Sequence, residues 1–77
     1  SVLFTFKYRT RAEVVEWLEV NRDASDTDSI MGCVMAWDLD DAFTAENVTR
    51  LCENYYGAGY AIVSAYLDEL RGARAKN

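Results

Sequence analysis

The chain has 77 residues, of which 51% are hydrophobic and 27% are charged, and this composition predicts one globular domain over residues 1–77 rather than a disordered chain. The absence of any run of 18 apolar residues argues against a membrane-spanning helix. The absence of histidine excludes histidine-based catalysis and histidine-ligated metal sites. Two cysteines, Cys33 and Cys52, are too few for a disulfide-stapled secreted domain, so we expect a reducing, cytoplasmic location.

The formal net charge is −5, and the basic residues are concentrated near the two ends of the sequence. Between Ala12 and Leu70 there are thirteen acidic and two basic residues, so this segment has a net charge of −11. Such a charge repels nucleic acid and membrane surfaces and attracts cationic partners. A charge of this size also keeps small domains soluble, and the sequence leaves both interpretations open.

The first part of the chain predicts a strand followed by a helix. Residues 2–9 alternate in the pattern of a half-buried strand, whose outer face is basic at one end. Thr10 and Glu13 have the spacing of a capping box, which predicts a helix from there to about Arg22. Acidic residues fall opposite the apolar face of this helix, namely Glu16, Glu19 and Asp23.

The segment Asn21–Ser29 predicts a loop and contains Asp23, Asp26 and Asp28. Closely spaced aspartates suggest calcium, but an EF-hand loop needs a ligand at its fifth position and a glycine at its sixth. Neither the register that starts at Asp26 nor the one that starts at Asp38 meets these requirements. We therefore predict no metal site and no cofactor.

The uncharged run Ile30–Trp37 predicts the central strand, apolar on both faces and therefore covered on both. Because one predicted helix separates it from the first strand, a right-handed β-α-β unit with parallel strands is the simplest arrangement. Three acids follow the run, namely Asp38, Asp40 and Asp41. They lie just before a helix whose predicted N-cap is Thr44, where the helix dipole favours negative charge.

The last part of the chain predicts a helix whose apolar face continues in phase across Gly57 and Gly59. This favours one long helix, kinked at the glycines, over two helices joined by a turn. The stretch Tyr55–Leu67 has no charged residue, which is typical of a buried helix or an interface. Tyr56 and Tyr60 are therefore candidate contacts for a partner or a second copy. The predicted fold is a small α+β or α/β domain with β-α-β-α order.

No motif in the sequence predicts catalysis. Cys33 and Cys52 lie on apolar faces without a CxxC partner, and no glycine-rich phosphate loop follows a strand. A magnesium site at Asp38 and Asp40 for phosphoryl chemistry is the best enzymatic alternative. Because no motif supports it, we expect a non-enzymatic protein.

The leading hypothesis is an acidic protein that docks on the basic, nucleic-acid-binding surface of a protein partner and does not itself bind nucleic acid. In general type the chain resembles small acidic proteins of phages and mobile elements, including anti-CRISPR proteins. This resemblance rests on size, one compact α/β unit, the absence of catalytic residues and the unpaired acids, with no shared motif. It implies steric blocking of a CRISPR effector subunit by DNA mimicry. The predicted partner-binding residues are Glu16, Glu19, Asp23, Asp26, Asp28, Asp38, Asp40 and Asp41.

The alternative is a self-associating structural or regulatory domain. In this interpretation the Tyr55–Leu67 helix forms a homodimer through Tyr56 and Tyr60, and the acids only keep the domain soluble.

Overall fold

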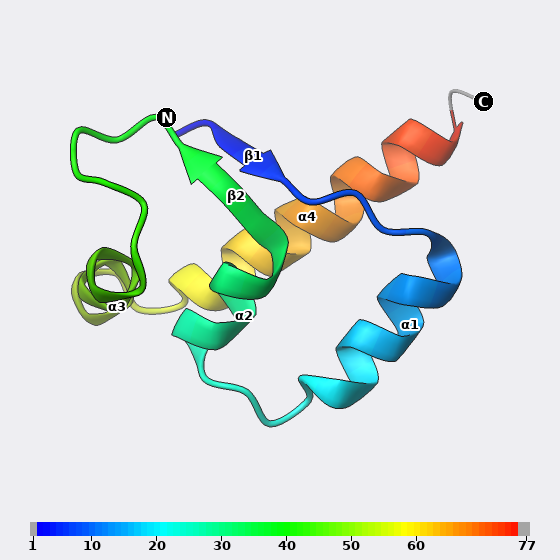
Figure 1. The fold of residues 1–77 in the computed structure, drawn as a ribbon, viewed down its shortest axis with the longest axis horizontal. Coiled ribbons are helices and arrows are strands. Elements are labelled where there is room, and N and C mark those ends of the chain that lie inside the picture. Colours follow the sequence, from blue (N-terminus) through cyan, green and yellow to red (C-terminus); the bar gives the residue numbers. More distant parts are fainter. Residues whose placement is uncertain (1, 76–77) are drawn as a thin grey trace.

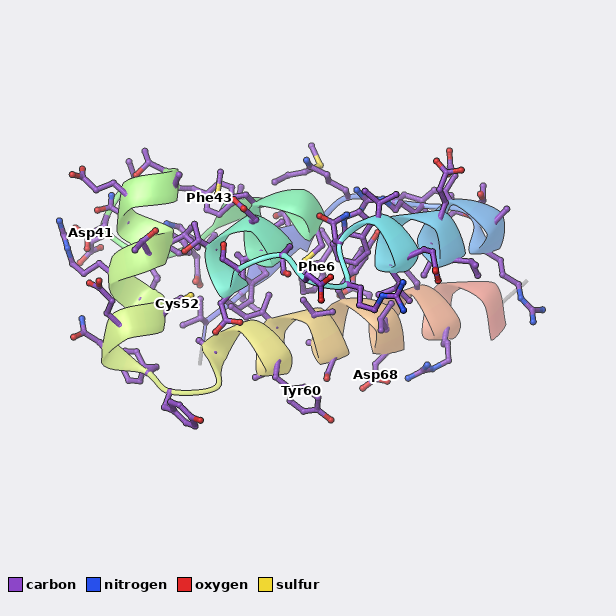
Figure 2. All side chains as sticks on the ribbon, turned by 90° about the horizontal axis from the view of Figure 1, so that it is seen from below. Phe6, Asp41, Phe43, Cys52, Tyr60 and Asp68 are labelled. Atoms are coloured by element: carbon purple, nitrogen blue, oxygen red, sulfur yellow. The ribbon has the colours of Figure 1, made fainter. Side chains whose placement is uncertain are left out.

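The computed structural model describes residues 2–75, which form one small α+β domain and confirm the predicted fold class. Helix α4 forms one layer, and the sheet with helices α1 and α2 forms the other (Figures 1 and 2). Helix α3 lies across one end of these layers, at the end opposite α1. In chain order the elements are β1 (Phe4–Phe6), α1 (Arg11–Val20), α2 (Asp26–Cys33), β2 (Val34–Trp37), α3 (Ala45–Asn54) and α4 (Ala58–Ala75).

Helices α1 and α3 begin where their capping residues predict. The Thr10 N–H donates to Glu13 Oε1 at 2.8 Å, and the Glu13 N–H donates to Thr10 Oγ1 at 3.2 Å, which completes the capping box. At the start of α3, the Thr44 hydroxyl accepts a hydrogen bond from the Asn47 N–H at 3.2 Å. Each cap satisfies backbone N–H groups that have no partner inside the helix.

The predicted central strand is wrong over its first half. Helix α2 covers Asp26–Cys33, and the strand β2 contains only Val34–Trp37. The Ser25 hydroxyl accepts from the Asp28 N–H at 3.1 Å and begins the helix inside the segment predicted as a loop. Ile30 and Cys33 are both fully buried. Residues three apart share one face of a helix but point to opposite faces of a strand, so the helix buries both together.

The predicted parallel pairing of the two strands is also wrong. Strands β1 and β2 are antiparallel, with Phe4 opposite Trp37 and Thr5 opposite Ala36. The register then shifts, so that the exposed Met35 becomes an extra residue in β2. Two helices rather than one lie between the strands, and α2 leads directly into β2. The chain thus enters β2 at Val34, beside Phe6 at the end of β1, and runs back along β1 in the opposite direction.

The predicted single long helix divides into α3 and α4, and the alternative of two helices joined by a turn is confirmed. Gly57 lies in the turn with φ of +85°, a left-handed backbone conformation that residues other than glycine rarely adopt. Gly59, in the first turn of α4, lies against Asp26 at the start of α2. A Cβ atom at Gly59 would be 2.6 Å from Asp26 Cγ, so glycine permits the close contact of the two helix ends.

The hydrophobic core lies between the two layers and is centred on Tyr66 of α4, the largest of the fully buried side chains. Its ring lies 5.4 Å from that of Phe6 and 5.6 Å, edge to face, from that of Trp17. The buried residues are Val14, Trp17, Ile30, Cys33, Val34, Val48, Ile62, Tyr66 and Leu70.

We expect Gly59→Ala to lower the free energy of unfolding by about 1–3 kcal/mol, because the added methyl group overlaps Asp26. Gly72→Ala is the matched control, since a Cβ atom at Gly72 meets nothing within 4 Å in α4. This control should raise the free energy of unfolding by up to about 1 kcal/mol. Urea denaturation of both variants measures the two changes, and equal changes would contradict the close contact.

Candidate functional site

The eight acids predicted to bind a partner are exposed, but the fold does not bring them onto one surface. Glu16 and Glu19 lie on α1, near one end of the molecule, and Asp23 follows that helix. Asp26 and Asp28 lie in the first turn of α2. Asp38, Asp40 and Asp41 lie between β2 and α3, at the end opposite α1 (Figures 1 and 2).

Several of these acids have local structural contacts. Asp38 Oδ1 accepts from the Leu3 N–H at 2.9 Å, which ties the start of the chain to the end of β2. Glu19 forms an exposed ion pair with Arg22 at 3.4 Å. Asp26 packs against Gly59. These three acids therefore have a structural role in the fold, whether or not they contact a partner. The role of the eight residues in partner binding stays a prediction.

The connection between α3 and α4 and the first turn of α4 present exposed aromatic side chains, which we call the tyrosine surface: Tyr55, Tyr56 and Tyr60. Tyr56 is fully exposed, and Tyr60 and Tyr55 are 82% and 65% exposed. Figure 2 shows Tyr60 projecting from α4 away from the other helices. Tyr56 and Tyr60, the two candidate contact residues predicted from the sequence, are both exposed, and their role in contacts stays a prediction.

A groove of about 290 Å³, which we call the α3 groove, adjoins the tyrosine surface through Tyr55. Trp37 Nε1 donates to the Asp41 carbonyl oxygen at 2.7 Å, and this bond fixes the indole in the groove wall. The lining is apolar over most of its area, and its polar residues are Asp41, Asn47, Arg50 and Asn54. The apolar lining residues are Val2, Trp37, Leu39, Leu51 and Tyr55.

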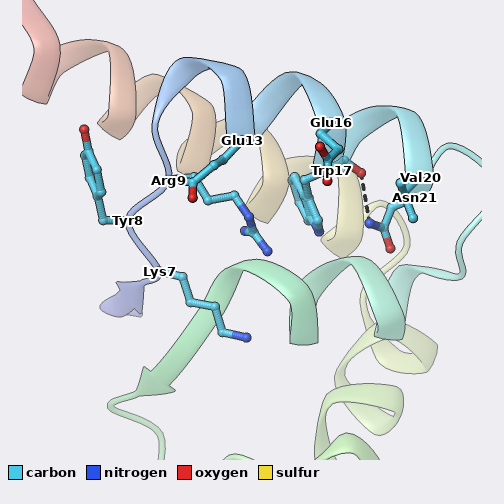
Figure 3. Close-up of a pocket in the computed structure, with 8 residues that line it drawn as sticks. All are labelled: Lys7, Tyr8, Arg9, Glu13, Glu16, Trp17, Val20 and Asn21. Atoms are coloured by element: carbon cyan, nitrogen blue, oxygen red, sulfur yellow. Dashed lines mark hydrogen bonds between the residues drawn. The ribbon is translucent and has the colours of Figure 1, made fainter.

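A second groove, of about 450 Å³, lies between α1 and the segment that follows β1, and we call it the α1 groove (Figure 3). Lys7 and Arg9 enter it from one side and Trp17 from the other. Lys7 Nζ donates to the Met31 carbonyl oxygen at 3.3 Å, and Arg9 donates to the Tyr66 hydroxyl at 3.1 Å. No pattern in the sequence predicts this groove, because its two sides come from separate segments, residues 7–9 and helix α1 with Asn21.

The two cysteines have the chemistry of core residues. Burial of Cys33 raises the pKa of its thiol to about 11. Burial, with a smaller contribution from the nearby Asp26 carboxylate, also raises the pKa of Cys52, which is half-buried. Because a thiol must lose its proton to act as a nucleophile, neither cysteine is activated.

A metal-binding group and a membrane-spanning helix are both absent from the described part of the chain. Residues 2–75 contain no group of three side chains placed to hold a metal ion. None of the helices in this range combines the length and the apolar character needed to cross a membrane.

We expect iodoacetamide at pH 8 to label Cys52 before Cys33 in the native protein. With a pKa of about 11, only about one Cys33 thiol in a thousand is ionised at this pH, and the thiolate that forms is buried. Mass spectrometry of proteolytic peptides measures the two rates. In urea the difference should disappear, whereas equal rates in the native protein would contradict the burial of Cys33.

Comparison with known proteins tests the leading functional hypothesis. The model of the phage tail assembly chaperone family matches residues 1–77. This chain belongs to the phage tail assembly chaperone family. No curated protein and no solved structure matches it.

Membership of this family confirms the phage character implied by the resemblance, but it shows that the predicted anti-CRISPR function is wrong. The predictions of DNA mimicry and of a CRISPR effector as the partner are therefore also wrong, since a tail assembly chaperone acts on proteins of the tail. The family implies a protein partner, as predicted, but one from the tail rather than a nucleic-acid-binding protein. The acidic charge, which suggested DNA mimicry, does not distinguish these two kinds of partner.

Proposed function

We propose that this chain binds an apolar segment of a phage tail protein, its client, and holds that segment until it is built into the tail. The contact region is the tyrosine surface together with the α3 groove. The observation that carries this proposal is the exposure of three tyrosines, one of which lines a mainly apolar groove, in a chain of the tail assembly chaperone family.

The chemistry of this region supports the proposal. Large apolar side chains gathered on the surface of a small domain mark a site of protein interaction. Tyrosine presents an extensive apolar ring and a hydroxyl group that can hydrogen-bond, and it is enriched among residues that dominate binding energy. The α3 groove provides the concave part of such a site, into which a client side chain can insert. Arg50 and Asn54 offer donors for client carbonyl groups.

The acidic charge has a role in the same function. The net charge of −5 separates copies of the chaperone by repulsion while their apolar surfaces are exposed or occupied. Charge of one sign also steers a client segment that carries basic residues near its apolar part. The predicted acids thus contribute mainly through the field of the whole molecule, and of the eight only Asp41 lines the α3 groove.

The proposed function needs no catalytic group. The raised pKa of both thiols leaves them protonated near neutral pH, and binding and release require no bond to be made or broken. The cytoplasmic location predicted from the two free cysteines stays a prediction.

We expect the double variant Tyr56→Ser/Tyr60→Ser to lose at least about tenfold in affinity for the client, since aromatic hot-spot residues contribute about 2 kcal/mol or more. Its stability should change little, because both side chains are exposed. The experiment co-expresses the chain with tail proteins of the same phage and measures their co-elution by size-exclusion chromatography. Val15→Ser on α1 is the control, since Val15 is also exposed and lines neither groove.

Retention of client binding in the double variant, at unchanged stability, would contradict the proposed contact region. Light scattering of the free chain tests the alternative of homodimerisation through the same tyrosines. A stable dimer that the double variant converts to a monomer, with client binding unaffected, would favour that alternative.

A further inference from the structure

We propose that the α1 groove binds one acidic side chain of a protein segment, a glutamate or aspartate with apolar residues on both sides. This inference rests on the proposed function only in naming the client as the source of that segment. It adds a second contact, on a part of the molecule separate from the tyrosine surface.

The first observation is that Lys7 and Arg9 form no close ion pair with any other described residue. The ion pairs within residues 2–75 are Glu19–Arg22 and Asp68–Arg71, and neither groove cation takes part in them. Lys7 and Arg9 instead donate to neutral oxygens, the Met31 carbonyl and the Tyr66 hydroxyl. An ammonium group has three N–H donors and a guanidinium group has five, so both retain donors for a carboxylate.

The second observation is that the Arg9 guanidinium is held in place before any ligand binds. Its central carbon lies 4.5 Å from the centre of the Trp17 ring and 5.9 Å from that of Tyr66. The Tyr66 hydroxyl that accepts its hydrogen bond belongs to a fully buried residue. Because the side chain is already ordered, binding a carboxylate costs little conformational entropy, and a planar guanidinium suits carboxylate geometry.

The third observation concerns what lies on each side of the cations. Figure 3 shows Tyr8 on one side of Lys7 and Arg9, and Trp17 with Val20 on the other. Tyr8 and Val20 are largely exposed, so apolar area is available on both sides. A residue inside a chain can place apolar neighbours on both sides of its carboxylate, whereas a chain terminus can do so on only one. The lining therefore favours an internal acidic residue over a C-terminal carboxylate.

Two acids of α1, Glu13 and Glu16, also line the groove and limit what it accepts. Hydrogen bonding to Thr10, with a smaller effect of the nearby Arg9 charge, lowers the pKa of Glu13. The Glu13 carboxylate accepts from the Thr10 N–H and so stays in the helix cap. Together the two negative charges balance the two cations, so a ligand with several acids would be repelled. The groove thus fits a single carboxylate in an apolar setting, bound by the two cations that an otherwise acidic chain places there.

The direct test uses a capped peptide as the probe, acetyl-Ala-Leu-Glu-Leu-Ala-amide, titrated into ¹⁵N-labelled protein and followed by NMR. We expect saturable shifts of the Lys7 and Arg9 amide signals and of the Trp17 indole N–H. The same peptide with glutamine for glutamate should bind at least about threefold more weakly, and added salt should reduce the difference. Equal binding of the two peptides would overturn the inference.

A third peptide separates the two sources of a carboxylate. It has glutamine at the centre and a free C-terminal carboxylate in place of the amide. If this peptide bound the groove as tightly as the capped glutamate peptide, the internal-residue proposal would be wrong.

Two variants of the protein test the assigned cations. Lys7→Gln and Arg9→Gln should each weaken binding of the glutamate peptide about threefold and leave the glutamine peptide unaffected. Arg71→Gln is the control, because it changes the net charge equally on the exposed part of α4. Arg9 packs on the core, so thermal unfolding is measured for each variant, and Lys7→Gln remains informative if Arg9→Gln is unstable. No effect of Lys7→Gln would contradict the assignment.

The double variant Tyr56→Ser/Tyr60→Ser distinguishes this inference from the proposed function. It should lose the client and still bind the glutamate peptide, since the tyrosines lie outside the α1 groove. If the unmodified chain bound the client but the glutamate peptide caused no shifts in its NMR signals, only the proposal for the α1 groove would be refuted.

Discussion

The packing of Tyr66 is the contact on which the arrangement of the other elements depends. Its ring meets Phe6 from the sheet and Trp17 from α1, and its hydroxyl accepts the Arg9 hydrogen bond. Helix α1 buries only Val14 and Trp17, so its position relies on few side chains. Truncation of Tyr66 would remove the main support of α1 and, with it, one wall of the α1 groove.

The small size of the domain explains why binding surfaces remain exposed. A chain of 77 residues has too few elements to cover all its apolar side chains, and here the core takes the inward faces of α2 and α4. The tyrosine surface and the α3 groove are what this packing leaves uncovered. Exposed apolar regions of this kind favour aggregation, and we propose that in this assembly chaperone they hold a client instead. The net negative charge counteracts aggregation, because copies of the chain repel one another.

The parts of the fold that follow from neighbouring residues were predictable, and those that depend on distant contacts were not. The caps at Thr10 and Thr44 involve residues three positions apart, and the sequence placed both correctly. Ser25 and Asp28 have the same spacing as a cap, but the uncharged run Ile30–Trp37 indicated a strand and α2 was not predicted. The exposure of Tyr60 followed from the excess of apolar positions in its helix. The α1 groove could not be predicted, since Arg9 meets Trp17 only after the fold forms.

Hydrogen–deuterium exchange of the chain, alone and with its tail protein bound, tests the central claim most directly. The account predicts slower exchange of backbone amides from Leu51 to Ala61, which span the end of α3, the turn and the start of α4. The exposed outer face of the sheet, where Met35 lies, should exchange at an unchanged rate. A client complex that forms without any protection of Leu51–Ala61 would contradict the claim that this region holds the client.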